Sequence, residues 1–253
     1  MRKITFVSVF LALFVIFNYS EQSPPIQLAS QYYTYHFPKN ERMVFLFIGV
    51  DYNTKEKEKD TFVEEIEIFE KEIIKSSTGV SKEIVSKSIY GKACVRSSCL
   101  EGLDWIVENC TEKDIAVVYI GTHGGIGTGS YAFYGNDKIP VKGSEVREKL
   151  SKIKCKLVLI VDTCKAGAML DSWKDYSSNV CIICSSSNTE STYCWKLTVA
   201  IRDALQKADE NNDGEIDLGE IRNYIPGRVR ELTKLQTVTM SDRFPPIVVG
   251  VRN

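Results

Sequence analysis

The chain of 253 residues is 43% apolar and 26% charged, with a formal net charge of −1. A chain of this size and apolar content can bury one substantial core, and without a leader it makes one domain of ordinary size. The balanced charge, and the lack of a basic patch with interleaved aromatic residues, argue against a nucleic-acid partner.

The first 20 residues have the pattern of a signal peptide. Arg2 and Lys3 precede an apolar run of 14 residues, which is shorter than the roughly 20 residues that span a bilayer. We therefore expect a secreted or exported protein with no stable membrane span after leader removal, the alternative being an uncleaved N-terminal membrane anchor. Residues 21–41 lack periodicity and are interpreted as a linker or pro-segment in which His36 is structural or exposed. Residues 42–253 form the predicted domain.

Apolar periodicity and turn residues predict alternating strands and helices along this domain. Strands are expected at 42–50, at 83–90, in the run that ends at His123, from Lys156, and at 180–184. Helices are expected from Asp60 to Lys75, after a capping box at Ser98 and Glu101, at 144–153 and at 197–208. A last helix is expected from Leu218, and Pro226 and Gly227 should cut it short. This alternation predicts an α/β three-layer fold with a mainly parallel sheet.

Two of the apolar runs end in reactive side chains. One reads IAVVYIGTHGG and ends at His123, and the other reads KLVLIVDTC and ends at Cys164. Because the carboxyl ends of parallel strands meet at one edge of a sheet, the imidazole could activate the thiol there as a nucleophile. The amides of Gly124 and Cys164 would then stabilise an oxyanion. The alternative is that Cys164 is a buried small side chain and His123 a turn residue.

The two motifs in this order resemble the caspase-like cysteine peptidases, above all the metacaspase and bacterial caspase-homologue branch, and more distantly legumain. The segment NVCIICSSSNTESTYCW is similar to the strand and loop that follow the nucleophile in these enzymes, and most of all to those of legumain. Ala166 and Thr122 depart from the metacaspase pattern, which has Ser and Gly at these places. The resemblance implies a caspase-like fold with helices on both faces of the sheet, and a cysteine endopeptidase that acts on proteins or peptides.

Asp162 stands two residues before Cys164, so on a strand its side chain would face the same way and line the pocket for the P1 residue. A carboxylate in that pocket would favour substrates with Arg or Lys as the P1 residue. The resemblance to metacaspases implies the same role for Asp162 and a second acid at the head of the first helix, for which Asp60 is the candidate. A strand-end cap or a purely structural hydrogen bond is the alternative for Asp162. Two other functions stay open: a legumain-like asparaginyl peptidase or transpeptidase, and a calcium-binding interaction protein on an inactive caspase-like scaffold.

The segment DENNDGEIDLGE, residues 209–220, matches an EF-hand calcium loop. Calcium requires hard oxygen ligands around a sharp turn, and Gly214 occupies the position where the loop turns. The expected ligands are the side chains of Asp209, Asn211, Asp213, Asp217 and Glu220, with the backbone carbonyl of Glu215. Bound Ca²⁺ would act as a structural clip, and the alternative is a polar surface turn.

The eight cysteines show no paired CxxC pattern for zinc, and no organic cofactor is expected. Cys94 with Cys99, and Cys110 with Cys155, are possible disulfide bridges. Cys181 and Cys184 are expected on opposite faces of a strand and should not pair.

Overall fold

The computed structural model describes residues 40–50, 61–127, 129–173, 178–192, 195–242 and 245–252, which all belong to one compact unit that begins at His36. The predicted signal peptide, His36 and Asp60 lie outside the described residues, as does nearly all of the predicted linker. The proposed domain boundaries therefore stay predictions. In the described ranges, no helix is both long and apolar enough to cross a bilayer.

The core is a six-stranded sheet. Its strands are β1 (Asn40–Gly49), β2 (Ser81–Tyr90), β3 (Ile115–Gly121), β7 (Lys156–Asp162), β8 (Val180–Cys184) and β10 (Thr239–Met240). The strands lie in the order β10-β8-β7-β3-β1-β2, and all neighbours are parallel except β10, which pairs with β8 in antiparallel fashion. Strands β3, β7 and β8 are nearly all apolar because both of their faces are covered. The edge strand β2 carries the polar sequence SKEIVSKSIY because it is partly exposed.

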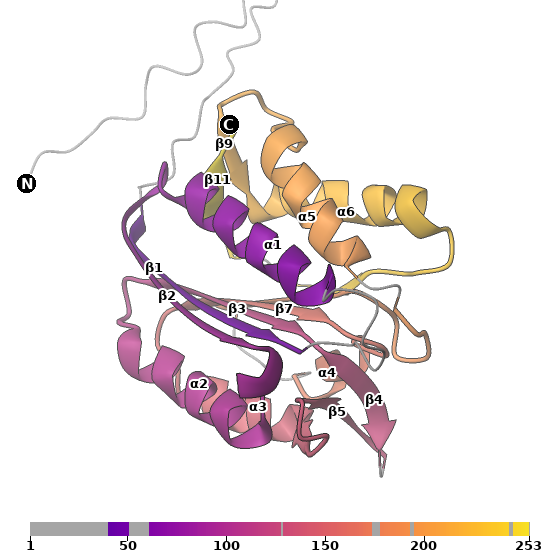
Figure 1. The fold of residues 1–253 in the computed structure, drawn as a ribbon. Coiled ribbons are helices and arrows are strands. Elements are labelled where there is room, and N and C mark those ends of the chain that lie inside the picture. The colour runs from indigo at the N-terminus through magenta and orange to yellow at the C-terminus, as the bar shows by residue number, and fades with distance from the viewer. Residues whose placement is uncertain are drawn as a thin grey trace, which may run out of the picture. The chain divides into compact units, whose positions relative to one another are not determined.

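Helices cover both faces of this sheet, as Figure 1 shows. One face carries α1 (Thr61–Ser77), α5 (Lys196–Lys207) and α6 (Leu218–Thr233), and the other carries α2 (Arg96–Asn109), α3 (Gly143–Leu150) and the short α4 (Ala168–Asp171). Alternate residues of β1 enter different cores: Phe45 and Phe47 lie on the α1 side, and Leu46 on the α2 side. The predicted three-layer α/β fold is confirmed.

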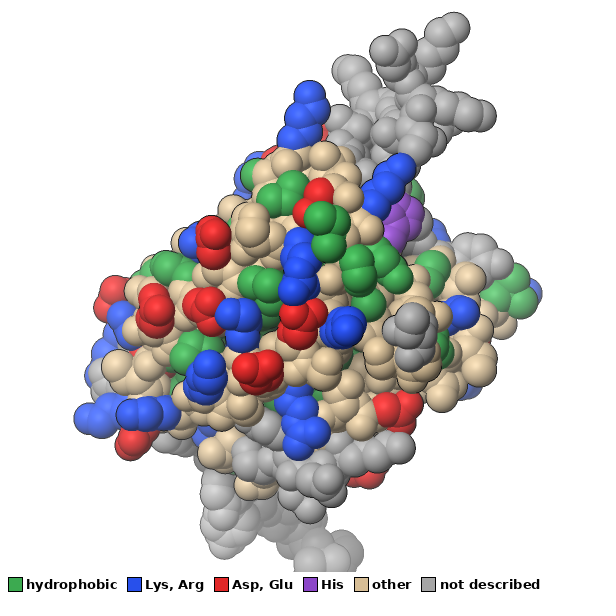
Figure 2. Space-filling model, turned by 90° about the horizontal axis from the view of Figure 1, so that it is seen from below, with side chains coloured by type: hydrophobic (Ala, Val, Ile, Leu, Met, Phe, Trp, Pro, Cys, Tyr) green, Lys and Arg blue, Asp and Glu red, His purple; other side chains and the backbone are tan. Residues whose placement is uncertain are grey.

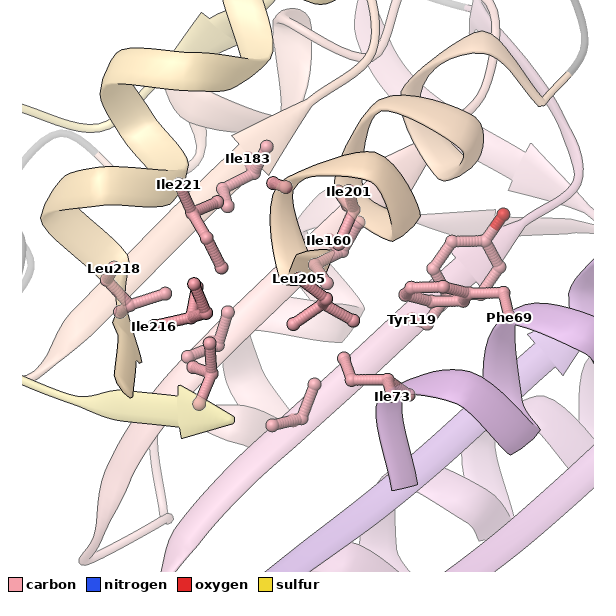
Figure 3. Packing of buried hydrophobic residues seen from close by; sticks show 14 of the residues in the cluster. Phe69, Ile73, Tyr119, Ile160, Ile183, Ile201, Leu205, Ile216, Leu218 and Ile221 are labelled. Atoms are coloured by element: carbon pink, nitrogen blue, oxygen red, sulfur yellow. The ribbon is translucent and has the colours of Figure 1, made fainter. Parts of the chain in front are cut away.

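The core on the α1 side brings together aliphatic residues from helix and sheet (Figure 3). Ile201 and Leu205 of α5 and Ile221 of α6 lie over Ile160 of β7 and Ile183 of β8. All five are at most 3% exposed. Cys181 belongs to this core and Cys184 to the opposite one, so the prediction that they face opposite ways is confirmed.

Two elements differ from the sequence prediction. Helix α6 does not end at Pro226 but continues to Thr233. A proline inside a helix costs about 3 kcal/mol, but Ile225 and Val229, both 0% exposed, keep the second half packed against the core. Helix α2 begins at Arg96, so Ser98 is its third residue and not its cap, and the Oγ of Ser98 accepts the amide of Val95 at 3.1 Å.

Two small antiparallel sheets lie outside the predicted elements. One contains β4 (His123–Gly127), β5 (Ser130–Tyr134) and β6 (Pro140–Lys142) in that order. The other pairs β9 (Glu215–Asp217) with β11 (Val248–Val251). A short 3-10 turn, η1 (Gly91–Ala93), links β2 to the α2 segment. Strands of three to five residues carry too little pattern to be predicted unless, as at 180–184, every residue is apolar.

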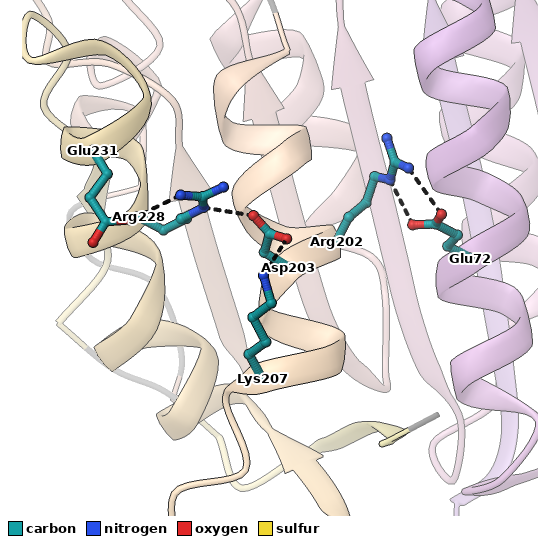
Figure 4. A network of polar contacts seen from close by, with 6 residues as sticks. All are labelled: Glu72, Arg202, Asp203, Lys207, Arg228 and Glu231. Atoms are coloured by element: carbon teal, nitrogen blue, oxygen red, sulfur yellow. Dashed lines mark hydrogen bonds and ion pairs between the residues drawn. The ribbon is translucent and has the colours of Figure 1, made fainter.

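Ion pairs join the three helices on the α1 side (Figure 4). Arg202 of α5 binds both carboxylate oxygens of Glu72 of α1, at 2.6 and 3.0 Å, and Arg228 of α6 binds Asp203 of α5 at 2.6 Å. The partly buried pair of Arg202 and Glu72 stabilises by about 1 kcal/mol or less. On the face seen in Figure 2, acidic and basic side chains are interspersed, which agrees with the balanced charge of the chain.

Candidate active site

His123 and Cys164 follow neighbouring strands at the same edge of the sheet. The register of β3 and β7 ends in the pair Gly121 and Asp162. His123 and Cys164 each stand two residues beyond that pair. The structure therefore brings the two predicted catalytic residues to one edge, as parallel strands with coincident carboxyl ends require.

Gly124 packs directly against the backbone that carries the thiol. A Cβ atom on Gly124 would lie 2.6 Å from the carbonyl oxygen of Cys164 and would also overlap the side chain of Thr163. Only glycine allows so close an approach. The histidine loop and the cysteine loop are therefore in contact at the place where the Gly124 and Cys164 amides are predicted to hold an oxyanion.

The imidazole is suited to act as a base. His123 opens β4, where it pairs with Tyr134 of β5, and its ring is partly accessible to solvent. Partial burial of the ring and the positive charge of Lys138 lower the pKa of His123 below its usual value. At neutral pH the ring is therefore mainly unprotonated and can accept a proton.

The peptide before the nucleophile is fixed by hydroxyl groups. The carbonyl oxygen of Thr163 accepts hydrogen bonds from the Oγ atoms of Ser185 and Ser186, both at 3.1 Å. The Oγ1 of Thr163 is 2.6 Å from the hydroxyl of Tyr131. All four side chains are buried, so these bonds satisfy polar groups that have lost water and hold the turn rigidly.

The segment after β8 reaches the thiol itself. The amide of Thr192 donates to the Sγ of half-buried Cys164 at 3.4 Å. Lys165, the next residue after the nucleophile, has a left-handed backbone with φ of 57°, and its amide donates to the carbonyl of Glu190 at 2.8 Å. An unfavourable conformation beside the thiol is thus held by a bond to this segment.

Asp162 lies beneath this site and is 1% exposed. Its Oδ2 accepts the hydroxyl of Thr198 of α5 at 2.9 Å, while its Oδ1 is buried and has no hydrogen-bond partner among the described residues. Burial raises the pKa of Asp162 to about 6. One oxygen thus has the structural role weighed as the alternative, and the other is enclosed rather than open to solvent. The proposed second acid, Asp60, lies outside the described residues.

The predicted calcium loop has the backbone of a tight turn. Asn212 and Gly214 have φ of 59° and 83°, and the amides of Asp213 and Gly214 donate to Asp209 at 3.1 and 3.2 Å. The carboxylate of Glu220 accepts the amides of Glu210 and Asp217, each at 3.0 Å. In the described part of the chain, no three His, Cys, Asp or Glu side chains gather as a metal-binding group. The oxygen donors suit calcium in kind, but these carboxylates are engaged with the loop amides.

Sequence patterns predict no role for Ser185, Ser186, Glu190 or Thr192. Glu190 and Thr192 contact the nucleophile turn through their backbone, which residue type does not reveal, and Ser185 and Ser186 contact it through hydroxyls that any polar loop could carry. The one available signal is the run of hydroxyl residues in SSSNTEST after a buried strand. A polar run next to the strand that carries the thiol is the pattern expected for a loop that lines the site.

Known proteins resemble this chain in sequence profile and in fold. The Peptidase C13 family profile matches residues 49–217. The crystal structure of the Drosophila initiator caspase Dronc aligns with a TM-score of 0.55 and 12% identity over 86% of this chain and 87% of that one. Caspase-1 from Spodoptera frugiperda aligns with a TM-score of 0.55 and 12% identity over 85% of this chain and 93% of that one. A protein from Geobacter sulfurreducens aligns with a TM-score of 0.52 and 9% identity over 84% of this chain and 97% of that one. No curated protein matches the chain.

These structural likenesses, with both reactive residues at the carboxyl edge of the sheet, define the fold as that of the caspase-like cysteine peptidases. The chain belongs to the Peptidase C13 family, which is legumain-like.

Proposed function

We propose that this protein is a cysteine endopeptidase with Cys164 as nucleophile and His123 as base. The observation that carries the proposal is the shared register of β3 and β7, together with the packing of Gly124 on the carbonyl of Cys164. His123 takes the thiol proton, and Sγ attacks the carbonyl carbon of the scissile bond. The amides of Gly124 and Cys164 stabilise the oxyanion.

The second half of the reaction uses the same groups. The imidazolium of His123 gives its proton to the leaving amine, which leaves an acyl group on Sγ. A water molecule, deprotonated by His123, then attacks the acyl carbon and releases the thiol. No group other than water is consumed.

For the P1 residue we propose Arg or Lys, bound through Asp162. A buried carboxylate with one unpartnered oxygen gains most from a cation, because the opposite charge compensates for its lost hydration. The legumain-like family match supports a second candidate, an Asn side chain whose amide N–H donates to the same oxygen. Caspase-like selection of Asp would place two carboxylates together and is disfavoured.

The test is cleavage of peptides that differ only at P1, by wild type, Cys164→Ala and His123→Ala. Each substitution should remove essentially all cleavage, because the two residues act as a unit. Iodoacetamide should inactivate the wild type by labelling Cys164, which peptide mass spectrometry would show. Near-full activity of Cys164→Ala would exclude the dyad, whereas a wild type that cleaves no peptide would leave the inactive-scaffold function. Faster cleavage after Asn than after Arg or Lys would show that the enzyme is an asparaginyl peptidase and not one specific for basic residues.

Two further properties belong to this proposal. The apolar leader at residues 1–20 supports export of the enzyme. The loop at 209–220 supports a bound Ca²⁺, held by oxygens of Asp209, Asn211, Asp213, Glu215, Asp217 and Glu220. When bound, the ion would supply positive charge that holds the α5–α6 connection together.

A further inference from the structure

The segment from Ser185 to Thr192 binds each of the four consecutive residues of the nucleophile turn. The amide of Thr192 donates to the Sγ of Cys164 at 3.4 Å, and the amide of Lys165 donates to the carbonyl of Glu190 at 2.8 Å. The amide of Ala166 donates to the Oγ of Ser186 at 3.0 Å, and the amide of Gly167 donates to the carbonyl of Ser186 at 2.9 Å. A Cβ on Gly167 would lie 2.9 Å from Ser186 O, so the two segments are in close contact. The position of the thiol therefore depends on this segment.

The Thr192 bond has a chemical consequence beyond position. An N–H that donates to sulfur stabilises the thiolate more than the thiol, because bonds to a charged acceptor are stronger. The reactive form of a cysteine nucleophile is the thiolate. The Thr192 amide is therefore placed to increase the reactivity of Cys164.

Thr192 must itself be held for that bond to persist. Its hydroxyl donates to Ser185 Oγ at 3.1 Å, but the stretch between the two is a loop with exposed residues at Asn188 and Thr189. The carboxylate of Glu190 fixes this loop. One oxygen accepts the amides of Ser187 and Thr237, at 3.2 and 2.9 Å, and the other accepts the Thr237 hydroxyl at 3.0 Å.

These contacts make Glu190 the point where three segments join: the loop itself, the nucleophile turn through the Glu190 carbonyl, and the stretch before β10 through Thr237. Burial raises the pKa of Glu190, but the hydrogen bonds from Thr237 and Ser187 outweigh it, so the pKa lies below its usual value. The side chain is therefore ionised at neutral pH and accepts all three bonds.

We propose that Glu190 is a positioning residue for the nucleophile: its carboxylate holds the 187–192 loop so that the Thr192 amide stays on the Sγ of Cys164. This inference rests on the proposed role of Cys164. It assigns to Glu190 no contact with substrate.

The test is the rate at which iodoacetamide alkylates Cys164 in the full-length protein, followed by mass spectrometry of the Cys164 peptide. In this step Sγ forms a bond to the methylene carbon and iodide leaves, so no peptide substrate is needed. Glu190→Ala should slow alkylation at pH 7 by about 10-fold, the effect of losing one hydrogen bond to a charged group. It should also move the pH at which the rate is half-maximal upward.

Glu190→Gln should stay within about threefold of wild type, since its amide oxygen can accept the two backbone amides and its NH₂ can donate to the Thr237 hydroxyl. Glu108→Gln is the matched control, because Glu108 is an exposed carboxylate of α2, outside the segments that hold the nucleophile turn. It should alkylate like wild type. Circular dichroism would show that each variant is folded.

An unchanged alkylation rate in Glu190→Ala would overturn the proposal. A fall in rate with no movement of the pH profile would also overturn it, because it would show loss of folded protein alone. If the wild type cleaved no peptide while Glu190→Ala still moved the profile, the positioning role would stand and the peptidase function would fail.

Discussion

At the scale of single residues, His123 and Cys164 can be predicted because their side chains end unbroken apolar strands. Strand ends in a parallel sheet are fixed by pattern alone, so the two residues meet without knowledge of the loops. Thr192 and Glu190 cannot be predicted in this way. The amide of Thr192 and the carbonyl of Glu190 act through the backbone, and a backbone group has the same chemistry in every residue type.

Gly124 and Gly125 offer a matched pair of substitutions. A methyl group on Gly124 would lie 2.6 Å from the Cys164 carbonyl oxygen, whereas a methyl group on Gly125 would have no atom within 4 Å. We expect Gly124→Ala to reduce kcat/KM by about 100-fold, as for a displacement of reacting groups by about 1 Å. Gly125→Ala should keep nearly full activity. Equal activity of the two variants in a peptide assay would show that Gly124 does not set the geometry.

The raised pKa of Asp162 predicts that selectivity for the P1 residue changes with pH. Burial raises the pKa of this carboxyl to about 6, so it becomes charged as the pH rises through that value. We expect the ratio of kcat/KM for a P1 Arg peptide over a P1 citrulline peptide to rise between about pH 5 and pH 7, because only Arg gains from the charge. The titration of the dyad affects both peptides and cancels in the ratio.

The same raised pKa also makes the stability of the folded state depend on pH. The folded state favours the protonated acid, so this contribution to stability is complete below the ordinary pKa of 3.8 and is lost as the pH rises through about 6. Asp162→Asn should therefore flatten the selectivity ratio without lowering the urea midpoint at pH 7, because the amide, like the protonated acid, places no charge in the core. A ratio that still rises with pH in Asp162→Asn would exclude this carboxyl as the P1 acid.

At the scale of elements, long periodic segments are predicted well and short or interrupted ones are not. The strand at 180–184 has the predicted bounds, since five apolar residues are bounded by turns. Helix α6 shows the reverse: Pro226 indicates an end, but buried contacts of Ile225 and Val229 outweigh that local preference. The His123 hairpin is missed because its glycine-rich sequence, HGGIG, lacks a strand pattern.

The connection from α5 to α6 carries the calcium prediction. Its strand β9 pairs with β11, so the loop has a backbone partner although the chain has a single loop of this pattern. We expect millimolar Ca²⁺ to raise the melting temperature and Glu220→Gln to remove most of that rise, because the last carboxylate of such a loop supplies two ligand oxygens. Glu108→Gln, on the exposed surface of α2, is the control. Calorimetry without binding heat would identify the segment as a polar turn.

At the scale of the whole molecule, the fold places both predicted cysteine pairs in contact. Cys94 and Cys99, each 0% exposed, have their sulfur atoms 3.7 Å apart. Cys110 is hydrogen-bonded to Cys155, which joins the end of α2 to the segment before β7. All four thiols are free in this structure.

The Cys110–Cys155 pair is the one we expect to oxidise first. The hydrogen bond from Cys110 lowers the pKa of Cys155 below its usual value, and Cys110 is half-buried rather than enclosed. In an oxidising compartment the thiolate of Cys110, the more accessible of the two, would attack a small disulfide such as oxidised glutathione and release one glutathione thiol. Cys155 would then attack the mixed disulfide and release the second, so that two glutathione thiols form for each protein disulfide.

The closed loop would include β3, the His123 hairpin and α3, so the bridge should stabilise the domain by about 4 kcal/mol in the chain-entropy account. The measurement is the melting temperature after incubation with oxidised glutathione, with the bridge mapped by mass spectrometry under non-reducing conditions. Cys110→Ser should abolish the gain. Cys181 and Cys184, which face opposite cores, serve as the internal control and should stay reduced. Recovery of Cys110 and Cys155 as free thiols after this treatment would contradict the prediction, because a partly exposed thiol beside a second thiol would then have failed to exchange with a small disulfide.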